Sequence, residues 1–165
     1  MSVNRGKQFE AAIYSAFQDP KVLAMRLYDQ TGGYLGVANI CDFVIYRDPL
    51  LLLLECKSVH GGTLNFVGKI SDRQWSGLLE KSGIPGVMAG IMVWFIDHDI
   101  TGFVPIQELE RIRQLGSKSL SVSHLLSDEV RWIPMPGKKL RVLWKYDGSN
   151  FLNLIQTQNQ GGPHE

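Results

Sequence analysis

The chain has 165 residues, of which 44% are hydrophobic and 20% charged, a composition typical of a globular domain and not of a disordered chain. Its 17 Lys and Arg residues nearly balance its 16 Asp and Glu residues, which excludes a strongly basic tail protein. Any polyanionic partner must therefore be bound by a local basic patch. We expect one domain over residues 1–152 and a flexible, polar C-terminal tail over residues 153–165.

The N-terminal segment and the cysteine content favour a soluble, cytoplasmic protein. Residues 1–7 lack the apolar core of a secretory signal, and the longest apolar run, residues 49–54, is too short to span a bilayer. Cys41 and Cys56 cannot form the disulfide framework of a small secreted domain or a four-ligand zinc site. The sequence thus predicts no membrane segment.

Hydrophobic periodicity and turn residues predict alternating helices and strands. The consecutive leucines of residues 50–54 predict a strand that is buried on both faces, so we expect helices on both faces of its sheet. A strand, a helix and a strand joined by short loops form a crossover unit, which predicts that the strands at 50–57 and 87–96 are parallel. In chain order we expect a helix at 5–17, a strand at 22–28, a Gly-rich loop at 31–36, strands at 40–46 and 50–57, a helix at 72–81, a strand at 87–96, a helix at 105–115 and a strand at 139–146.

Glu10 has an unusual place on the first helix. With about 100° between successive residues, its side chain falls inside the apolar stripe formed by Phe9, Ile13, Tyr14 and Phe17. A carboxylate in that position costs free energy unless it has a partner. The alternative is a glutamate at the edge of the stripe that reaches solvent.

The hairpin formed by the strands at 40–46 and 50–57 brings charged residues together. A tight turn at Asp48 and Pro49 places Asp42 directly opposite Glu55, and Lys57 lies on the same face of the strand as Glu55. The same register places Cys41 opposite Cys56 on the other face, where we expect two small buried side chains and no nucleophile. The alternative is a cross-strand ladder of charges on a wet face.

The two carboxylates predict a cation site. Carboxylates that lie this close repel each other, and one must hold a proton unless a cation intervenes. Mg²⁺ binds one or two carboxylates together with water and a substrate phosphate, and it can lower the pKa of a bound water. Lys57 could orient that water or neutralise charge on a phosphate.

Asp42 followed by Glu55-Cys56-Lys57 resembles the split Asp…Glu-X-Lys signature of the PD-(D/E)XK nuclease superfamily, with Cys56 at the variable position. The flanking segments are similar to Holliday-junction resolvases of the RecU and archaeal Hjc type. The similar segments are residues 4–10 (NRGKQFE), residues 55–58, residues 63–66 followed by Gln74, and a late basic loop at residues 116–120. The resemblance covers residues 4–120.

This resemblance implies an α/β protein with a single-domain restriction-endonuclease-like core, in which helices flank both faces of a central mixed β-sheet. It implies a homodimeric endonuclease that depends on Mg²⁺, with Mn²⁺ able to substitute, and that needs no nucleotide cofactor. Asp42 and Glu55 would bind the metal, with the backbone carbonyl of Cys56 and with Glu10, directly or through water. Lys57 would be the catalytic lysine.

Two features of the resemblance leave alternatives open. Gln74 would face the catalytic site, but Ser71-Asp72-Arg73-Gln74 also fits a capping box in which Gln74 only satisfies a backbone N–H. RecU has a long stalk before its catalytic aspartate, whereas only residues 32–40 stand there in this chain.

Phosphate contacts supply most of the affinity of structure-selective DNA-binding proteins. The candidates near the expected site are Arg5, Lys7, Lys69 and Arg73, and a second basic group comprises Lys118, Lys138, Lys139 and Arg141; either set could instead be a solvated surface. A two-fold dimer could cut symmetric strands of a junction. Its interface could use Trp94, Phe95, Phe103 and Trp132, although core packing is the commoner role of such residues.

The sequence supports one leading function and two alternatives. The leading function is an endonuclease that resolves four-way (Holliday) junctions by metal-dependent phosphodiester hydrolysis with paired symmetric nicks. The first alternative is a nuclease of the same superfamily that acts on flaps, nicks or duplex DNA. The second is a non-catalytic junction-binding protein, which would not need clustered acids beside DNA. The small size suggests a phage or mobile-element protein.

Overall fold

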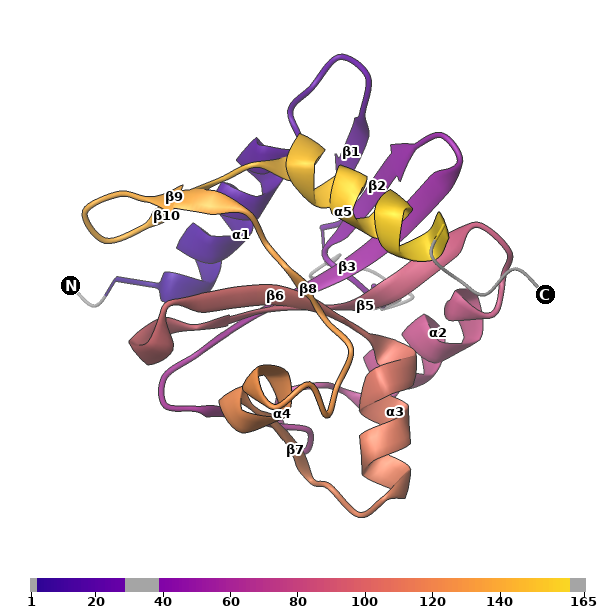
Figure 1. Cartoon of the computed structure of the whole chain (residues 1–165), viewed down its shortest axis with the longest axis vertical. Helices are drawn as coiled ribbons and strands as arrows, with labels where there is room; N and C mark the ends of the chain where they lie inside the picture. The colour runs from indigo at the N-terminus through magenta and orange to yellow at the C-terminus, as the bar shows by residue number, and fades with distance from the viewer. Residues whose placement is uncertain (1–2, 29–38, 161–165) are drawn as a thin grey trace, which may run out of the picture.

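A computed structural model describes residues 3–28 and 39–160 of the chain (Figure 1). The Gly-rich loop expected at residues 31–36 lies outside the described residues. The helices are α1 (Arg5–Ala16), α2 (Asp72–Ser82), α3 (Ile106–Gln114), α4 (Val122–Leu126) and α5 (Gly148–Gln160), with a 3-10 turn η1 at Ile96–His98. The strands are β1 (Leu23–Arg26), β2 (Phe43–Arg47), β3 (Leu50–Val59), β4 (Thr63–Asn65), β5 (Val87–Phe95), β6 (Ile100–Pro105), β7 (Ser119–Ser121), β8 (Ile133–Pro134), β9 (Gly137–Lys139) and β10 (Trp144–Tyr146).

A mixed sheet of six strands, in the order β1-β2-β3-β5-β6-β8, forms the centre of the fold. The hairpin β2–β3 is antiparallel, and β3 runs parallel to β5 with α2 in the crossover between them, as the sequence predicted. β3 and β5 carry apolar side chains on both faces and therefore occupy the middle of the sheet.

Helices cover both faces of this sheet, so the predicted α/β architecture is confirmed (Figure 1). On one face, α2 and α3 pack over a cluster that includes Leu53 and Leu78. On the other face, α1 and α5 pack over a cluster that includes Ile13, Leu54 and Phe151. Successive residues of β3 alternate between the two clusters, so odd-numbered side chains point toward α2 and even-numbered ones toward α1. No helix in the described ranges is long and apolar enough to cross a bilayer.

Helix α5 corrects the expectation that the chain is a flexible tail from residue 153 onward. The helix continues to residue 160, and Phe151 and Ile155 are fully buried against the sheet. Burying a side chain of this size contributes about 1.5–3 kcal/mol. Arg47 at the end of β2 also donates a hydrogen bond to Asn153 Oδ1 (2.9 Å). The apolar face and this polar contact explain why a segment of polar composition is ordered.

Other segments also differ from the prediction, and the short elements β4, β7, α4 and β8 were not expected. The strand expected at 139–146 is a hairpin, β9–β10, closed by a hydrogen bond from Leu140 N to Leu143 O (2.8 Å). Strand β6 was not expected, and it pairs antiparallel with β5 along six residues. Both differences depend on strand partners that are not visible in a local pattern.

The aromatic residues considered for a dimer interface belong to the core. Trp94, Phe95 and Phe103 are 2%, 0% and 0% exposed, so they offer no surface to a second chain. Trp132 is partly buried, and its indole N–H donates to Leu125 O (3.0 Å). The alternative prediction, that these aromatic residues pack in the core, is correct for Trp94, Phe95 and Phe103.

Candidate active site

The site begins at the open end of the β2–β3 hairpin. The ladder pairs Phe43 with Leu54, which is the register that a turn at residues 48–49 predicts. Asp42 precedes β2 directly: its backbone N–H donates to Leu54 O (2.9 Å), and its Oδ2 accepts from the backbone N–H of Cys56 (2.8 Å). The carboxylate of Asp42 is thereby held beside the segment of β3 that carries Glu55.

Glu55 is a buried carboxylate with two fixed donors. Its side chain points toward α2, and the residue is only 3% exposed. Lys57 Nζ lies 2.7 Å from its Oε1, and Gln74 Nε2 donates to the same oxygen at 2.8 Å. Both donors bind Oε1, which leaves Oε2 as the oxygen that neither of them occupies.

Burial is the main reason why the pKa of Glu55 is raised to about 7, and the neighbouring charge of Asp42 raises it further. The Lys57 ammonium and the Gln74 amide act in the opposite direction without cancelling these two effects. The repulsion between the two carboxylates that the hairpin register predicted is therefore present at this site. A cation placed between them would relieve it.

Gln74 satisfies both of the roles that the sequence left open. Its Oε1 accepts from the backbone N–H of Ser71 (3.1 Å) and the Ser71 hydroxyl accepts from the backbone N–H of Gln74 (3.1 Å), which is a complete capping box at the start of α2. Its Nε2 is then free to bind Glu55. The cap orients the amide, and the amide orients the carboxylate.

Glu10 reaches the same region from α1, on the other face of the sheet. Its Oε2 lies 2.7 Å from Nη2 of Arg26 in β1. This arginine is the partner that a carboxylate in the apolar stripe was expected to need. Burial and the charge of Asp42 raise the pKa of Glu10, whereas Arg26 and Lys57 lower it. Glu10 therefore lies close enough to Asp42 and Lys57 for their charges to shift its pKa. Arg26 was missed by the sequence analysis, because nothing in the local pattern of β1 marks it as the partner of a residue on α1.

The two cysteines lie on opposite faces of the sheet, which corrects the expectation that they pair across the hairpin. Cys41 packs in the cluster under α2, whereas Cys56 packs in the cluster under α1. The ladder ends at Phe43, so the alternation of faces does not extend to Cys41. Burial raises the pKa of the Cys41 thiol to about 12 and also raises that of Cys56 well above its usual value. Both thiols stay protonated and neither is a nucleophile, as expected.

The donor set suits a hard divalent cation that brings its own water ligands. In the part of the chain that the structure describes, no three carboxylate, thiol or imidazole side chains form a ready-made metal cage. Asp42 and Glu55 supply two carboxylates instead, and Mg²⁺ is commonly bound by one or two carboxylates plus water and phosphate. The residues present therefore fit Mg²⁺ better than a metal that needs a full protein shell, such as structural zinc.

Four cations were expected to contact DNA near this site. Arg5 and Lys7 lie in the first turn of α1, and Lys7 is close enough to Glu10 to lower its pKa. Lys69 is exposed in the segment before α2, and Arg73 is exposed next to Gln74 in the first turn of that helix. The four residues thus come from the N-terminal ends of the two helices that carry Glu10 and Gln74.

The second basic group of the prediction does not form one patch. Lys138, Lys139 and Arg141 belong to the β9–β10 hairpin, where Lys139 binds Asp99. Lys118 directly precedes β7, and Figure 1 shows β7 and the β9–β10 hairpin in separate parts of the fold. The sequence could not show that Lys118 lies apart from the basic residues of the hairpin, because their positions depend on how the chain packs around the sheet.

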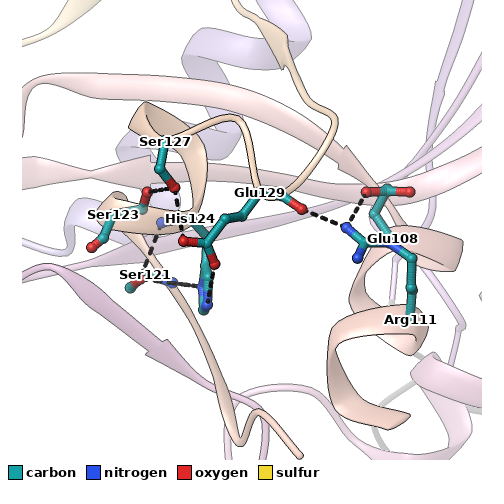
Figure 2. A network of polar contacts seen from close by, with 7 residues as sticks. All are labelled: Glu108, Arg111, Ser121, Ser123, His124, Ser127 and Glu129. Atoms are coloured by element: carbon teal, nitrogen blue, oxygen red, sulfur yellow. Dashed lines mark hydrogen bonds and ion pairs between the residues drawn. The ribbon is translucent and has the colours of Figure 1, made fainter. Parts of the chain in front are cut away.

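A second polar cluster has the residue types of a nucleophilic triad but not its arrangement (Figure 2). Ser121 Oγ lies 3.2 Å from His124 Nδ1, and His124 Nε2 lies 4.0 Å from Glu129. His124 Nδ1 also accepts from the backbone N–H of Ser121 (3.0 Å), and Ser121 Oγ accepts from the backbone N–H of His124 (3.3 Å). The pair is the capping box of α4, in which each side chain accepts a hydrogen bond from the backbone of the other residue. Arg111 anchors the neighbouring segment by donating to Glu129 O (2.5 Å) and Glu108 Oε2 (2.9 Å).

No known family model matches the chain, and no curated protein matches it. Among solved structures, Hjc from Archaeoglobus fulgidus, a Holliday junction resolvase from an archaeal hyperthermophile, matches with a TM-score of 0.51 and 20% sequence identity. The match covers 72% of this chain and 89% of the Hjc chain. At this level of identity the likeness concerns the fold. The chain therefore has a fold similar to that of an archaeal Hjc, in agreement with the resemblance found in its sequence.

Proposed function

We propose that this protein is a metal-dependent endonuclease that cuts branched DNA, with the four-way junction as its substrate. The observation that carries the proposal is the cluster at the end of β3, where a buried Glu55 is bound by Lys57 and Gln74 and lies within the field of Asp42. A carboxylate pair with an adjacent lysine suits phosphodiester hydrolysis because it can bind a cation and a phosphate together. The fold shared with Hjc supports the choice of DNA as substrate.

Asp42 and Glu55 would hold Mg²⁺, or Mn²⁺ in its place, and the backbone carbonyl of Cys56 is a third candidate ligand. When bound, the metal would lower the pKa of a water ligand and neutralise charge on the phosphate. Arg26 binds Oε2 of Glu10 at 2.7 Å, so Glu10 would contribute through its other oxygen, directly or through water, while this ion pair is kept.

The side chains around the carboxylates have separate tasks. Lys57 is 22% exposed at its side chain, so its ammonium can bind a phosphate oxygen or the attacking water while staying beside Glu55. Gln74 holds Glu55 in one orientation through the cap of α2, which keeps the carboxylate in place before substrate arrives. Glu55 must be ionised to bind a cation, and its pKa of about 7 implies that cation binding displaces a proton near neutral pH.

Junction selectivity is proposed to come from geometry and not from base recognition. Arg5 and Lys7 at the start of α1, and Lys69 and Arg73 near the start of α2, would contact phosphates. A homodimer would present two such sites related by a two-fold axis, which suits paired, symmetric nicks in a symmetric junction.

The proposal is tested with a labelled synthetic four-way junction, and with duplex and flap DNA of the same sequence, in Mg²⁺, Mn²⁺ and EDTA. We expect paired symmetric cuts confined to the junction, which are absent in EDTA and in Glu55→Gln and Lys57→Ala. The matched controls are Glu80→Gln and Lys81→Ala, which make the same changes at exposed positions of α2 and should cut normally. Cutting of all three DNAs would refute the junction claim, and junction binding without any cutting would refute the nuclease.

A further inference from the structure

A cavity of about 370 Å³ lies beside the first turn of α2, outside the carboxylate cluster. Its apolar floor comes from Phe66, Ile70 and Trp75, which are buried, and from Val67, which is 90% exposed at the rim. Val67 therefore extends the apolar lining of the cavity out to solvent. The cavity thus offers an apolar recess to a ligand from solvent.

An arginine packs over a tryptophan ring at the wall of this cavity. The guanidinium carbon of Arg113 lies 4.5 Å from the ring centroid of Trp75. Glu110 fixes both partners, since its Oε2 lies 2.7 Å from Arg113 Nη2 and accepts from Trp75 Nε1 at 2.7 Å. The side chain of Arg113 remains 48% exposed, so one face of the guanidinium is stacked and the other can be reached by a ligand.

The charge of the rim favours an anion. Arg113 and the exposed Lys118 line the cavity, and the exposed Lys69 lies in the same segment as its floor. Asp72 lines the cavity and Glu110 is paired with Arg113, so these three cations exceed the two neighbouring acids by one charge. The rim therefore carries a net positive charge next to an apolar recess and a preorganised guanidinium plane.

The cavity is connected to the candidate active site through a single side chain. Ser71 lines the cavity, and its backbone N–H donates to Gln74 Oε1 (3.1 Å). The other end of the same amide binds Glu55 at 2.8 Å. The first turn of α2 thus borders both the cavity and the candidate active site.

We propose that the cavity binds one unstacked nucleotide of the DNA strand adjacent to the cleavage site; this inference rests on the proposed function. The base stacks on the outer face of Arg113 above the apolar floor, and Lys118 binds its phosphate. Stacking on a planar side chain beside cations is how proteins bind single-stranded nucleotides without reading their sequence. Taking a nucleotide out of the stack costs least where its stacking is already disturbed, and a branch point interrupts the continuous stack of the duplex.

The test is a cycle that combines protein variants with abasic DNA. Four-way junctions carry one abasic residue at successive positions around the branch point, and their affinities are measured in EDTA so that neither metal nor cleavage is needed. The protein variants are Arg113→Gln and Val67→Glu. Val67→Glu changes an exposed side chain and keeps the test valid if Arg113→Gln disturbs the packing of α2 on α3. Lys81→Ala, at the other end of α2, is the control.

We expect one abasic position to weaken binding by the wild type and by Lys81→Ala about 5- to 150-fold. The same abasic residue should weaken binding by Arg113→Gln and Val67→Glu no further, because the stacking contact is already lost. Equal abasic penalties in all four proteins would overturn the cavity proposal even if the wild type cuts junctions with Mg²⁺. Conversely, the expected cycle in a protein that cuts no DNA would retain the nucleotide site and refute the nuclease.

Discussion

The raised pKa of Glu55 makes a quantitative prediction about stability. The pKa of Glu55 is 4.5 in the unfolded chain, its ordinary value, and about 7 in the folded chain. Folding therefore favours the protonated form of Glu55. Its contribution to stability is therefore fully present below about pH 4.5 and is lost as pH rises through 7. The difference between these two pKa values corresponds to about 3 kcal/mol, most of which falls between pH 5 and pH 8.

Glu55→Gln removes this titration while keeping the shape of the side chain. The free energy of unfolding of the variant, relative to that of the wild type, should rise by about 2–3 kcal/mol from pH 5 to pH 8. Urea denaturation of both proteins in EDTA at the two pH values measures this quantity, and Glu80→Gln, an exposed glutamate of α2, should show no such change. A relative stability that stays constant, or that falls as pH rises, would refute the argument that Glu55 is destabilised by burial and by Asp42.

Three further predictions concern the neighbours of Glu55. Gln74→Ala removes both the cap of α2 and the contact with Glu55, so urea denaturation should show a loss of about 1 kcal/mol and cleavage should fall about 10- to 100-fold; a change in stability alone would contradict the positioning role. Arg26→Gln removes a cation that lowers the pKa of Glu10, so a carboxyl NMR titration should place that pKa higher than in the wild type, and an unchanged value would contradict the ion pair. Mg²⁺ should raise the thermal midpoint of the wild type but not that of Asp42→Asn, and an equal shift in both would place the cation elsewhere.

The hairpin and the crossover could be predicted from the sequence because both are set by short connections. A tight turn at residues 48–49 fixes which residues of β2 and β3 face each other, and Phe43 does pair with Leu54. The helix between β3 and β5 requires the two strands to be parallel, and they are. The prediction failed at Cys41, where the ladder has ended and the alternation of faces no longer applies.

The rest of the fold depends on partners that are distant in the sequence. Helix α5 has a polar composition and is ordered by Phe151 and Ile155, whose burial needs the sheet to exist first. The β9–β10 hairpin turns between Leu140 and Leu143, apolar residues that give no turn signal. These elements are determined by tertiary packing and not by local pattern.

The residues of the candidate site also divide into those whose contacts could be predicted from the sequence and those whose contacts could not. Asp42, Glu55 and Lys57 lie on connected strands, so their proximity follows from strand geometry. The sequence allowed two roles for Gln74, capping α2 or facing the site. Only the two hydrogen bonds of its amide show that it does both. Arg26 gave no signal, because its ion pair with Glu10 joins β1 to α1 across the edge of the sheet.

The most direct test of the central claim measures junction cleavage and junction binding with the same variant. Glu55→Gln removes a negative charge beside the proposed path of the DNA, so binding in EDTA should be retained or become tighter. Its single-turnover cleavage in Mg²⁺ should fall about 100- to 1000-fold or more, because the site has lost one of its two cation-binding carboxylates. This separation of cleavage from binding is the result that a nuclease site at Asp42, Glu55 and Lys57 predicts. Cleavage by Glu55→Gln at the wild-type rate would contradict it.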